Sequence, residues 1–498
     1  MTAVALPSLL PLLVVLTPLL GAILLGLIGH HRRLLAPLAL GAAGLCLGLM
    51  LVLVATVRLG LQPELALMQL APPMRIELRV DALGALFALT IAALFPLALA
   101  YALKFLAEDA HLKRFLALVL AAQGLMLGVA FAANLLTLLA FYELFSLISY
   151  PLIVHDRSPR ALAAGLKYIV YIIVGGMFIL TGIILVYALA GDLTFVPGGL
   201  LDPAAARTPA LVAWACLMIG FGVKAALMPL HGWVADAHPA APAPFSAILS
   251  GVMVAAGSFG ILRVLFQVFG IELLGQLGVM PWLAIIAGAS AILAGALAIG
   301  EDEFKRRLAY STISQMAYVV LAIAMLSELA LVGALVHISH HAFIKAGLFF
   351  CAGLIVMVTG HKKVSEFDGL ARRMPATAVL LTLLSLAMLG VPPLSGFLSK
   401  WLLGVGLVES GGLLPLAVLI VGTLLAAAYL WPVIFRIWLP REDVQRADAA
   451  LSGQPRLMVL ALAATALITV LLGLAASLPG LPLELARLAA SALIGPGG

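Results

Sequence analysis

The residues best suited to chemistry in this sequence are six ionisable side chains that lie inside long apolar runs. One is a carboxylate and five are basic: Glu143, Lys167, Lys224, Arg263, Lys345 and Lys400. A charged group at the centre of a membrane costs about 2.5–3.5 kcal/mol by insertion scales, so it needs a partner, a water-filled cavity or a function. Lys167 and Arg263 lie near the ends of their runs, where snorkelling to the interface is an equal alternative. The other four predict the transfer of protons or cations.

A second group of residues forms one stripe on a predicted helix. His337, His341 and Lys345 are spaced i, i+4 and i+8, so they share a helical face. Imidazole titrates near neutrality and a buried lysine can be shifted toward it, so the stripe suits a proton wire. Structural histidines are an alternative. A zinc site is a weaker one, because no third ligand of the right kind follows.

Two of the lysines lie beside interruptions in apolar helices. Lys224 is followed by Pro229, and Lys400 follows Pro392, Pro393 and Gly396. Proline breaks the backbone hydrogen-bond ladder and exposes carbonyls. Interrupted segments at corresponding positions of two halves point to inverted repeats with an ion site near the midplane.

The short segment that follows Lys224 contains two further candidates, His231 and His238. Because it adjoins a broken helix, this segment is a possible cytoplasmic entry for protons toward Lys224. The alternative is a rigid, proline-rich turn in which the histidines only cap helices.

The composition shows which elements must position these groups. Of the 498 residues, 64% are hydrophobic and 10% are charged, which excludes an ordinary soluble enzyme and a disordered chain. The sequence predicts an all-α polytopic membrane protein, because most of its apolar runs can cross the ~30 Å hydrocarbon layer as helices. The fourteen runs are 7–28, 34–57, 81–103, 115–133, 135–154, 163–190, 209–230, 244–270, 279–300, 308–327, 329–358, 376–399, 411–438 and 456–480.

The sequence indicates no other chemistry. The three cysteines, Cys46, Cys216 and Cys351, are far apart inside apolar runs and suggest neither a disulfide framework nor a metal site. No nucleotide, flavin, haem or iron–sulfur pattern is present, so we expect no cofactor, no metal and no catalytic residue in this chain. The scattered basic residues also argue against a nucleic-acid partner.

The distribution of the basic residues predicts an orientation. Connections after the odd-numbered runs hold eighteen Lys and Arg: Arg32, Arg33, Lys104, Lys113, Arg114, Arg157, Arg160, Lys305, Arg306, Arg307, Lys362, Lys363, Arg372, Arg373, Arg436, Arg441, Arg446 and Arg456. The opposite side holds five: Arg58, Arg75, Arg79, Arg207 and Arg487. The positive-inside rule places the first set in the cytoplasm, so both termini are expected on the outer side of the cell (plasma) membrane.

Several local motifs together resemble the antiporter-like family. They are Tyr142-Glu143-Leu144, Val223-Lys224 through Trp233, Ala237-His238-Pro239 through Ala247, Phe304 through Gln315, His341 through Ala346, and Pro393 through Lys400. The family comprises the large subunits of Mrp-type cation/proton antiporters and the related pumping subunits of respiratory complex I and of membrane-bound hydrogenases. The resemblance covers roughly residues 80–440.

The resemblance implies about fourteen helices with two inverted five-helix repeats and broken helices in spans 7 and 12. The chain then divides into residues 1–80 (spans 1–2 and an outer loop), 81–114 (span 3 and a cytoplasmic loop), 115–270 and 279–438 (the repeats), and 456–498 (span 14 and a short tail). It also implies that Glu143 pairs with Lys224. Lys345 with His337 and His341 resembles the central relay, and Lys400 the terminal ionisable residue.

One position departs from the family pattern, because Ala255 stands where a lysine is usual. The proton would then pass from Lys224 to Lys345 by water, Ser250, Ser258 or another helix. The favoured function is an ion-translocating subunit of a multi-subunit complex, most like the fourth-type (type D) large Mrp subunit, which moves protons and possibly sodium. The alternatives are a pump subunit of a complex I-like or hydrogenase-like oxidoreductase, and a scaffold that no longer conducts.

Overall fold

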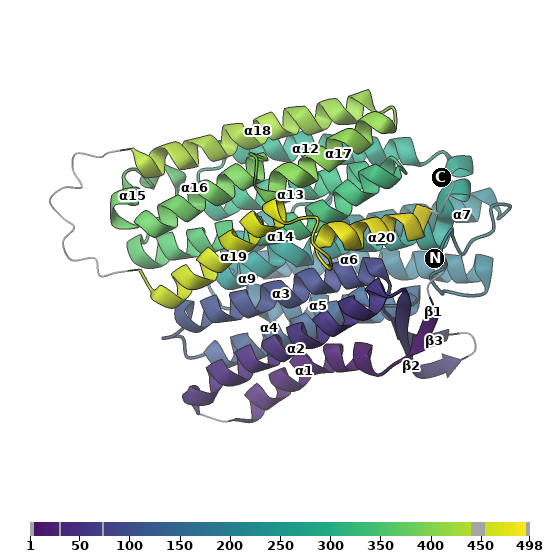
Figure 1. The fold of residues 1–498 in the computed structure, drawn as a ribbon, viewed down its shortest axis with the longest axis horizontal. Helices are drawn as coiled ribbons and strands as arrows, with labels where there is room; N and C mark the ends of the chain where they lie inside the picture. The colour runs from purple at the N-terminus through teal and green to yellow at the C-terminus, as the bar shows by residue number, and fades with distance from the viewer. Residues whose placement is uncertain (1–3, 29–30, 72–73, 440–453, 495–498) are drawn as a thin grey trace.

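The computed structural model describes residues 4–28, 31–71, 74–439 and 454–494, and within these ranges the chain is a bundle of roughly parallel helices (Figure 1). The strands are β1 (Val4–Pro7), β2 (Leu61–Ala71) and β3 (Met74–Arg79). The first helices are α1 (Leu10–Leu27), α2 (Leu35–Arg58), α3 (Ala82–Phe105), α4 (Leu112–Ala130), α5 (Leu135–Ile153), α6 (Pro159–Ala190), α7 (Arg207–Lys224), α8 (Val234–Ala240), α9 (Ala243–Ile248), α10 (Ala255–Val264) and α11 (Gly270–Leu277). The later helices are α12 (Met280–Gly300), α13 (Phe304–Ala324), α14 (Glu328–Thr359), α15 (Leu370–Arg373), α16 (Pro375–Leu389), α17 (Ser395–Glu409), α18 (Leu413–Trp438), α19 (Arg456–Leu474) and α20 (Pro482–Ile494).

Several long helices begin where the sequence supplies a side-chain cap. Asp81, Asn134, Ser158 and Ser327 precede α3, α5, α6 and α14, and each side chain accepts a hydrogen bond from a backbone N–H of the first turn. Such caps satisfy one of the N–H groups that have no partner within the helix. These four residues therefore help to fix where their helices begin.

The structure confirms the predicted helical membrane fold, with one small sheet added, and eleven of the described helical segments are long and apolar enough to cross a membrane. The predicted spans outside these eleven are the seventh, tenth and twelfth. The tenth, α13, begins with the charged stretch Lys305–Arg307, and the twelfth consists of two 15-residue helices, α16 and α17. The seventh, α7, carries a basic residue at each end.

Both predicted helix breaks are present, although the boundaries differ from the expected ones. α7 ends at Lys224 and α8 begins at Val234, so the first break is longer than the proline alone suggested. After the second break, α17 begins at Ser395 and ends at Glu409, which is ten residues beyond the predicted end of the twelfth run at residue 399. The reason is that the run after Lys400 is apolar and contains no further proline.

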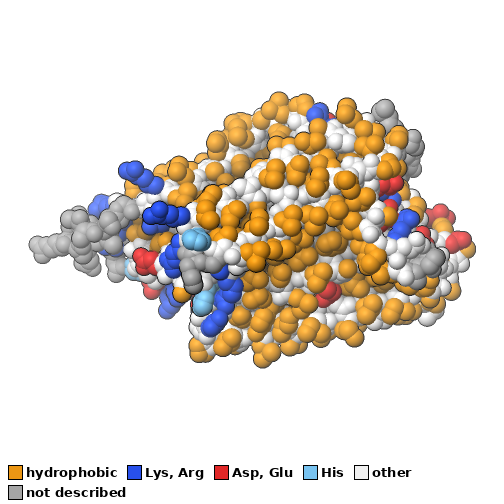
Figure 2. Space-filling model, turned by 90° about the horizontal axis from the view of Figure 1, so that it is seen from below, with side chains coloured by type: hydrophobic (Ala, Val, Ile, Leu, Met, Phe, Trp, Pro, Cys, Tyr) orange, Lys and Arg blue, Asp and Glu red, His pale blue; other side chains and the backbone are white. Residues whose placement is uncertain are grey.

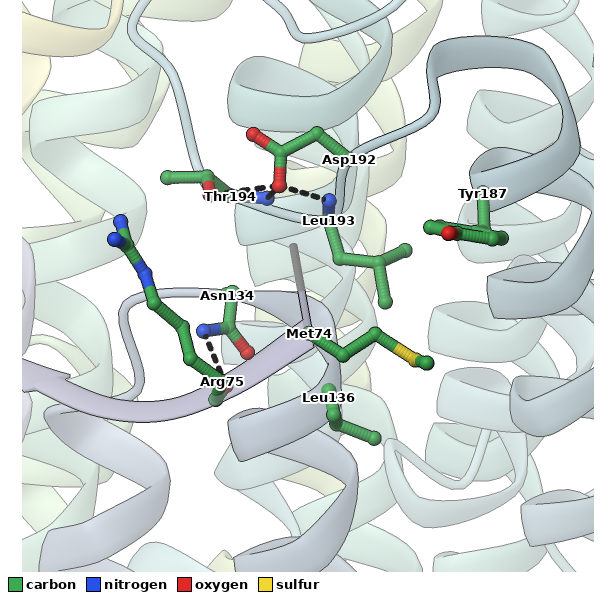
Figure 3. Close-up of a pocket in the computed structure, with 8 residues that line it drawn as sticks. All are labelled: Met74, Arg75, Asn134, Leu136, Tyr187, Asp192, Leu193 and Thr194. Atoms are coloured by element: carbon green, nitrogen blue, oxygen red, sulfur yellow. Dashed lines mark hydrogen bonds between the residues drawn. The ribbon is translucent and has the colours of Figure 1, made fainter. Parts of the chain in front are cut away.

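One end of the bundle carries a small sheet that the sequence did not predict. β2 pairs with β1 in parallel and with β3 in an antiparallel ladder. The α4–α5 and α6–α7 connections join this sheet, because Arg79 of β3 donates from its backbone to the Phe131 carbonyl and from its side chain to the Phe195 carbonyl. Figure 3 shows the same junction, where the Asn134 side chain donates to the Arg75 carbonyl and Asp192 accepts from Leu193 and Thr194. The predicted tail likewise contains the helix α20, held to the end of α2 by an Arg58–Glu484 ion pair.

The opposite end of the bundle is built from the basic connections. Asp109 bonds His155, Arg160 pairs with Glu303, and Phe304 donates from its backbone to Lys362, so four connections meet there. Figure 2 shows lysine and arginine side chains gathered at this end, beside a broad band of hydrophobic side chains. We call it the basic end. Arg441 and Arg446 lie outside the described residues.

Candidate ion-translocation site

Lys224 lies at the end of α7 in a fully buried cage of side chains from α5 and α6. Its Nζ donates to Ser146 Oγ at 2.8 Å and to Tyr168 Oη at 3.1 Å, and it lies 4.2 Å from the centre of the Phe145 ring. The break beside it is closed by Trp233, whose indole N–H donates to the Val223 carbonyl at 2.8 Å. The cage therefore consists of neutral acceptors and aromatic faces, which stabilise a cation.

The expected ion pair between Glu143 and Lys224 is not formed. The ion pairs of the described residues do not include it, and Lys224 is turned toward Ser146, one helical turn along α5 from Glu143. The Glu143 carboxylate lies against Gly176 of α6, where a Cβ would be only 2.6 Å from Oε1. Oε1 is buried and has no hydrogen-bond partner in the described part of the chain.

Lys345 lies in the middle of α14 and is fully buried. Its Nζ donates to Ser311 Oγ at 2.6 Å and to the Leu308 carbonyl at 3.0 Å, both on α13. Ser311 Oγ lies 2.7 Å from Tyr429 Oη of α18. Lys345 is thus held by a serine hydroxyl, as Lys224 is.

The predicted histidine stripe is present on α14. The rings of His337 and His341 lie 6.0 Å apart, and His337 Nδ1 lies 3.0 Å from Ser399 Oγ of α17. Neither ring nitrogen of His341 has a partner among the described residues, although the side chain is fully buried. His340, off the stripe, is held by the Ser395 carbonyl at 2.7 Å. The stripe therefore joins Lys345 to the start of α17.

Lys400 lies on α17, and its side chain reaches back across the second break. Its Nζ donates to the carbonyls of Met388 at 2.8 Å and Leu389 at 3.4 Å, the last residues of α16. A helix end leaves such carbonyls without intrahelical partners and carries partial negative charge, so a cation is favourable there.

The two histidines of the candidate entry segment lie in different surroundings. His231 is partly buried, with its ring 6.5 Å from that of Tyr310. His238 is fully buried and stacks on Phe349 of α14 with ring centres 4.9 Å apart. The structure therefore separates two residues that the sequence grouped together.

Lys167 and Arg263 have carboxylate partners. Lys167 pairs with Asp236 at 2.8 Å, and both side chains are more than one third exposed. Arg263 is buried and bonds both oxygens of Asp81, with further bonds to Gln267 and the Ala130 carbonyl. Arg263 does not snorkel, because Asp81, the cap of α3, provides a charge partner inside the protein.

The hydroxyl partners were missed by sequence reasoning. Ser146, Tyr168 and Ser311 each accept a lysine hydrogen bond, and only Ser146 had a signal, its spacing of three residues from Glu143. Near Ala255, Ser250 Oγ lies 2.6 Å from Thr312 Oγ1, next to the Ser311 that holds Lys345. Ser258 Oγ is buried without a partner in the described residues.

The geometry suits proton transfer better than metal binding. Within the described residues, no group of three His, Cys, Asp or Glu is placed to hold a metal ion. Lys224, Lys345 and His337 each lie at hydrogen-bond distance from a serine hydroxyl, and titratable groups can exchange protons along such hydrogen bonds.

The titratable groups at the basic end lie outside the apolar layer. Burial lowers the pKa of the His155 imidazole, although Asp109 at 3.2 Å opposes the shift. Burial opposes ionisation of Asp109 too, but the His111 backbone N–H and the His155 side chain hold its pKa below the usual value.

The fold and the site define a polytopic membrane protein with ionisable groups at broken helices. A family model described as "NADH:quinone oxidoreductase/Mrp antiporter, TM" matches residues 132–427. The chain therefore belongs to this family and is an antiporter-like membrane subunit.

Known relatives come from more than one kind of complex. NADH-quinone oxidoreductase subunit N of Desulforudis audaxviator is 37% identical over 376 residues, covering 74% of each chain. Hydrogenase-4 component B of Escherichia coli is 33% identical over 356 residues, which is 66% of this chain and 51% of that protein. The solved Mrp complex of Dietzia sp. contains a chain that matches with a TM-score of 0.87 at 24% identity, over 98% of both chains. That structural match concerns the fold alone.

Proposed function

We propose that this chain conducts protons through a relay of Glu143, Lys224, His337, His341, Lys345 and Lys400 inside a multi-subunit membrane complex. The observation that carries the proposal is that the three buried or half-buried lysines are held only by hydroxyls, carbonyls and aromatic faces. A buried lysine with no carboxylate within ion-pair distance has a smaller preference for its charged form than an ion-paired one, so it can release a proton.

The contacts of Lys224 suggest how the relay switches. Glu143 and Ser146 lie one turn apart on α5, so Lys224 can reach either by a shift of about 5 Å. Pairing with Glu143 would hold Lys224 protonated. Release to Ser146 and Tyr168, the arrangement observed here, favours loss of its proton toward Lys345 and Lys400.

The hand-over between Lys224 and Lys345 would use hydroxyl groups where the family has a lysine. Ser250 and Thr312 lie between the two halves, and Thr312 adjoins Ser311, the partner of Lys345. This pair supports conduction in spite of Ala255, and it argues against a scaffold that no longer conducts.

The orientation and location follow from the basic end. We infer that the basic end faces the cytoplasm and that the sheet and both termini face outward across the cell membrane, because lysine and arginine are retained on the cytoplasmic side. The two inverted repeats, 115–270 and 279–438, are part of this proposal. α6 and α14, which occupy equivalent places in them, are both 32 residues long.

The parent complex has two candidates. The first is an Mrp-type antiporter in which this chain is the type D-like subunit, and the matching family model, whose description includes the Mrp antiporter, supports it. The second is a complex I-like or hydrogenase-like oxidoreductase, which the 37% identity to a subunit N supports. Purifying the tagged chain with its native partners distinguishes them: small antiporter subunits support the first candidate, and nickel–iron or quinone-module subunits support the second.

The relay is tested by replacing its members in the intact complex. Lys224→Ala and Glu143→Ala should each abolish ion-driven or redox-driven proton translocation in sealed vesicles. Lys167→Ala is the matched control, since this lysine is ion-paired at the surface of α6 and should leave translocation unchanged. Full translocation by assembled Lys224→Ala complexes would show that the relay is wrong.

A further inference from the structure

A pocket lies at the basic end, beside the end of α14, the helix that carries Lys345. Its volume is about 260 Å³, and it lies between the α3–α4, α5–α6, α8–α9 and α12–α13 connections and the end of α14. Its lining is rich in titratable groups: Asp109, His155, Asp156, Arg160, Glu303, Lys305, His361 and Lys362. A pocket of this size and polarity holds several waters.

Lys305 connects this pocket to α8. Its Nζ donates to the carbonyls of Ala241 at 2.5 Å and Pro239 at 3.4 Å, at the end of that helix. Both residues also line the pocket. The residue before Pro239 is His238, so the lysine contacts the backbone directly beside this imidazole.

His238 occupies the position between the pocket and the relay. Its ring stacks on Phe349, which lies one turn after Lys345 on the same face of α14. His238 lies within electrostatic range of Lys305 on one side and of Lys345 and His341 on the other. The imidazole is fully buried, and neither of its nitrogens has a hydrogen-bond partner in the described ranges. A buried polar group of this kind calls for a functional explanation.

The first half of the relay has no comparable connection to this pocket. None of the side chains around Lys224, namely Phe145, Ser146 and Tyr168, is part of the pocket lining. His231, the other histidine of the same segment, also lies outside the lining. Three residues of α14, the helix that carries Lys345, do line the pocket (Ala352, Gly353 and Val356), whereas no residue of α7 is part of its lining.

We propose that protons enter the Lys345 half of the relay directly from the basic end, through the pocket around Lys305 and by way of His238, without passing Lys224. The inference rests on the proposed relay function and names the proton entry of its Lys345 half, so that translocation needs both Lys224 and His238. Lys305 holds the floor of the pocket against α8, and the His238 imidazole accepts a proton on one nitrogen and releases one from the other. His231 has no part in this inlet.

The first test compares the two histidines in the intact complex. His238→Gln keeps a similar volume but cannot carry a proton, so translocation in vesicles should fall by at least about tenfold. His231→Gln should change it by less than about twofold. An assembled His238→Gln complex that translocates at the wild-type rate would overturn the inlet.

The second test blocks the pocket after assembly, so it does not depend on how His238→Gln folds. Ala240→Cys places a thiol in the pocket, and Ala110→Cys places one in the exposed α3–α4 connection outside the lining. A bulky, membrane-impermeant thiol reagent applied from the basic side should stop translocation only in Ala240→Cys. Confirmed labelling without loss of translocation would exclude the inlet.

The experiments distinguish an error in the proposed inlet from an error in the proposed relay. If both Lys224→Ala and His238→Gln complexes translocate normally, the relay itself is wrong. If Lys224→Ala abolishes translocation while His238→Gln and the blocked pocket do not affect it, the relay stands and only the inlet is wrong.

Discussion

Two regions of this protein contain charged groups in the apolar layer, and the buried charges are stabilised by different partners in each. Toward the sheet end, Arg263 is bound by both oxygens of Asp81 and by Gln267. In the interior, Lys224 and Lys345 are held by serine hydroxyls, a tyrosine and a carbonyl, with no carboxylate within ion-pair distance among the described residues. The difference teaches that a dedicated counter-ion holds a charge permanently, whereas neutral acceptors leave a proton free to move.

The largest expected effect on stability is at Arg263. Arg263→Ala leaves Asp81 buried without its partner, so the chain should lose about 3–5 kcal/mol of stability. The measurement is the unfolding midpoint of the detergent-purified complex, followed by tryptophan fluorescence. A midpoint equal to that of the wild type would show that the Arg263–Asp81 pair contributes no more to stability than the buried lysines do.

Lys345 should behave in the opposite way. Lys345→Met replaces a buried ammonium by an apolar chain of similar length, while Ser311 keeps Tyr429 as a partner. Stability should stay the same or rise by up to about 2 kcal/mol, because the desolvation cost disappears. Proton translocation in vesicles should be lost. Destabilisation as large as that of Arg263→Ala would break the comparison between the two regions.

The hydrogen bond between Lys224 and Ser146 tests how much a single neutral acceptor contributes to holding a buried lysine. Ser146→Ala removes an acceptor of Lys224, and a hydrogen bond to a charged group is worth about 1.5–3 kcal/mol. The observed arrangement of Lys224 should therefore become less populated, and the translocation rate should fall several-fold. Ser314→Ala is the matched control, since this buried hydroxyl donates to the Ala291 carbonyl instead of bonding a lysine. Equal rates for the two variants would contradict the role of Ser146.

The smallest effect is expected at Lys167. Its ion pair with Asp236 is more than one third exposed on both sides, so Lys167→Ala should change stability by only about 0–1 kcal/mol. The unfolding midpoint and the translocation rate are both expected to remain near the wild type. A large fall in the unfolding midpoint or in the translocation rate would show that Lys167 contributes as much as the buried ionisable residues do.

The broad design was readable from the sequence because it depends on local patterns. Apolar runs and prolines have short-range causes, so most of the long helices and both breaks were predicted. The histidine stripe was predicted because its spacing places the residues on one helical face whatever the neighbours are.

The partners of the charges could not be predicted, because they are contributed by distant segments. Arg263 and Asp81 are separated by 182 residues, and Lys224 and Ser146 by 78. The predicted Glu143–Lys224 pair stays a prediction for the same reason: Lys224 bonds Ser146 in this structure, and the choice between a carboxylate and a hydroxyl one turn away depends on side-chain placement. The sheet was also missed, because β1 and β2 pair across the whole length of α1 and α2.

The sequence by itself determined that this chain lives in a membrane, which end carries the positive charge, and which rare ionisable residues lie in the apolar layer. These follow from composition and periodicity, which need no knowledge of neighbours. Only the tertiary structure decided which of those residues are neutralised by a carboxylate and which are held by neutral groups. It also separated His238, beside the pocket and α14, from His231. The physical reason is that the charge of a buried group depends on the atoms within a few ångströms of it, and packing brings those atoms together from distant parts of the chain.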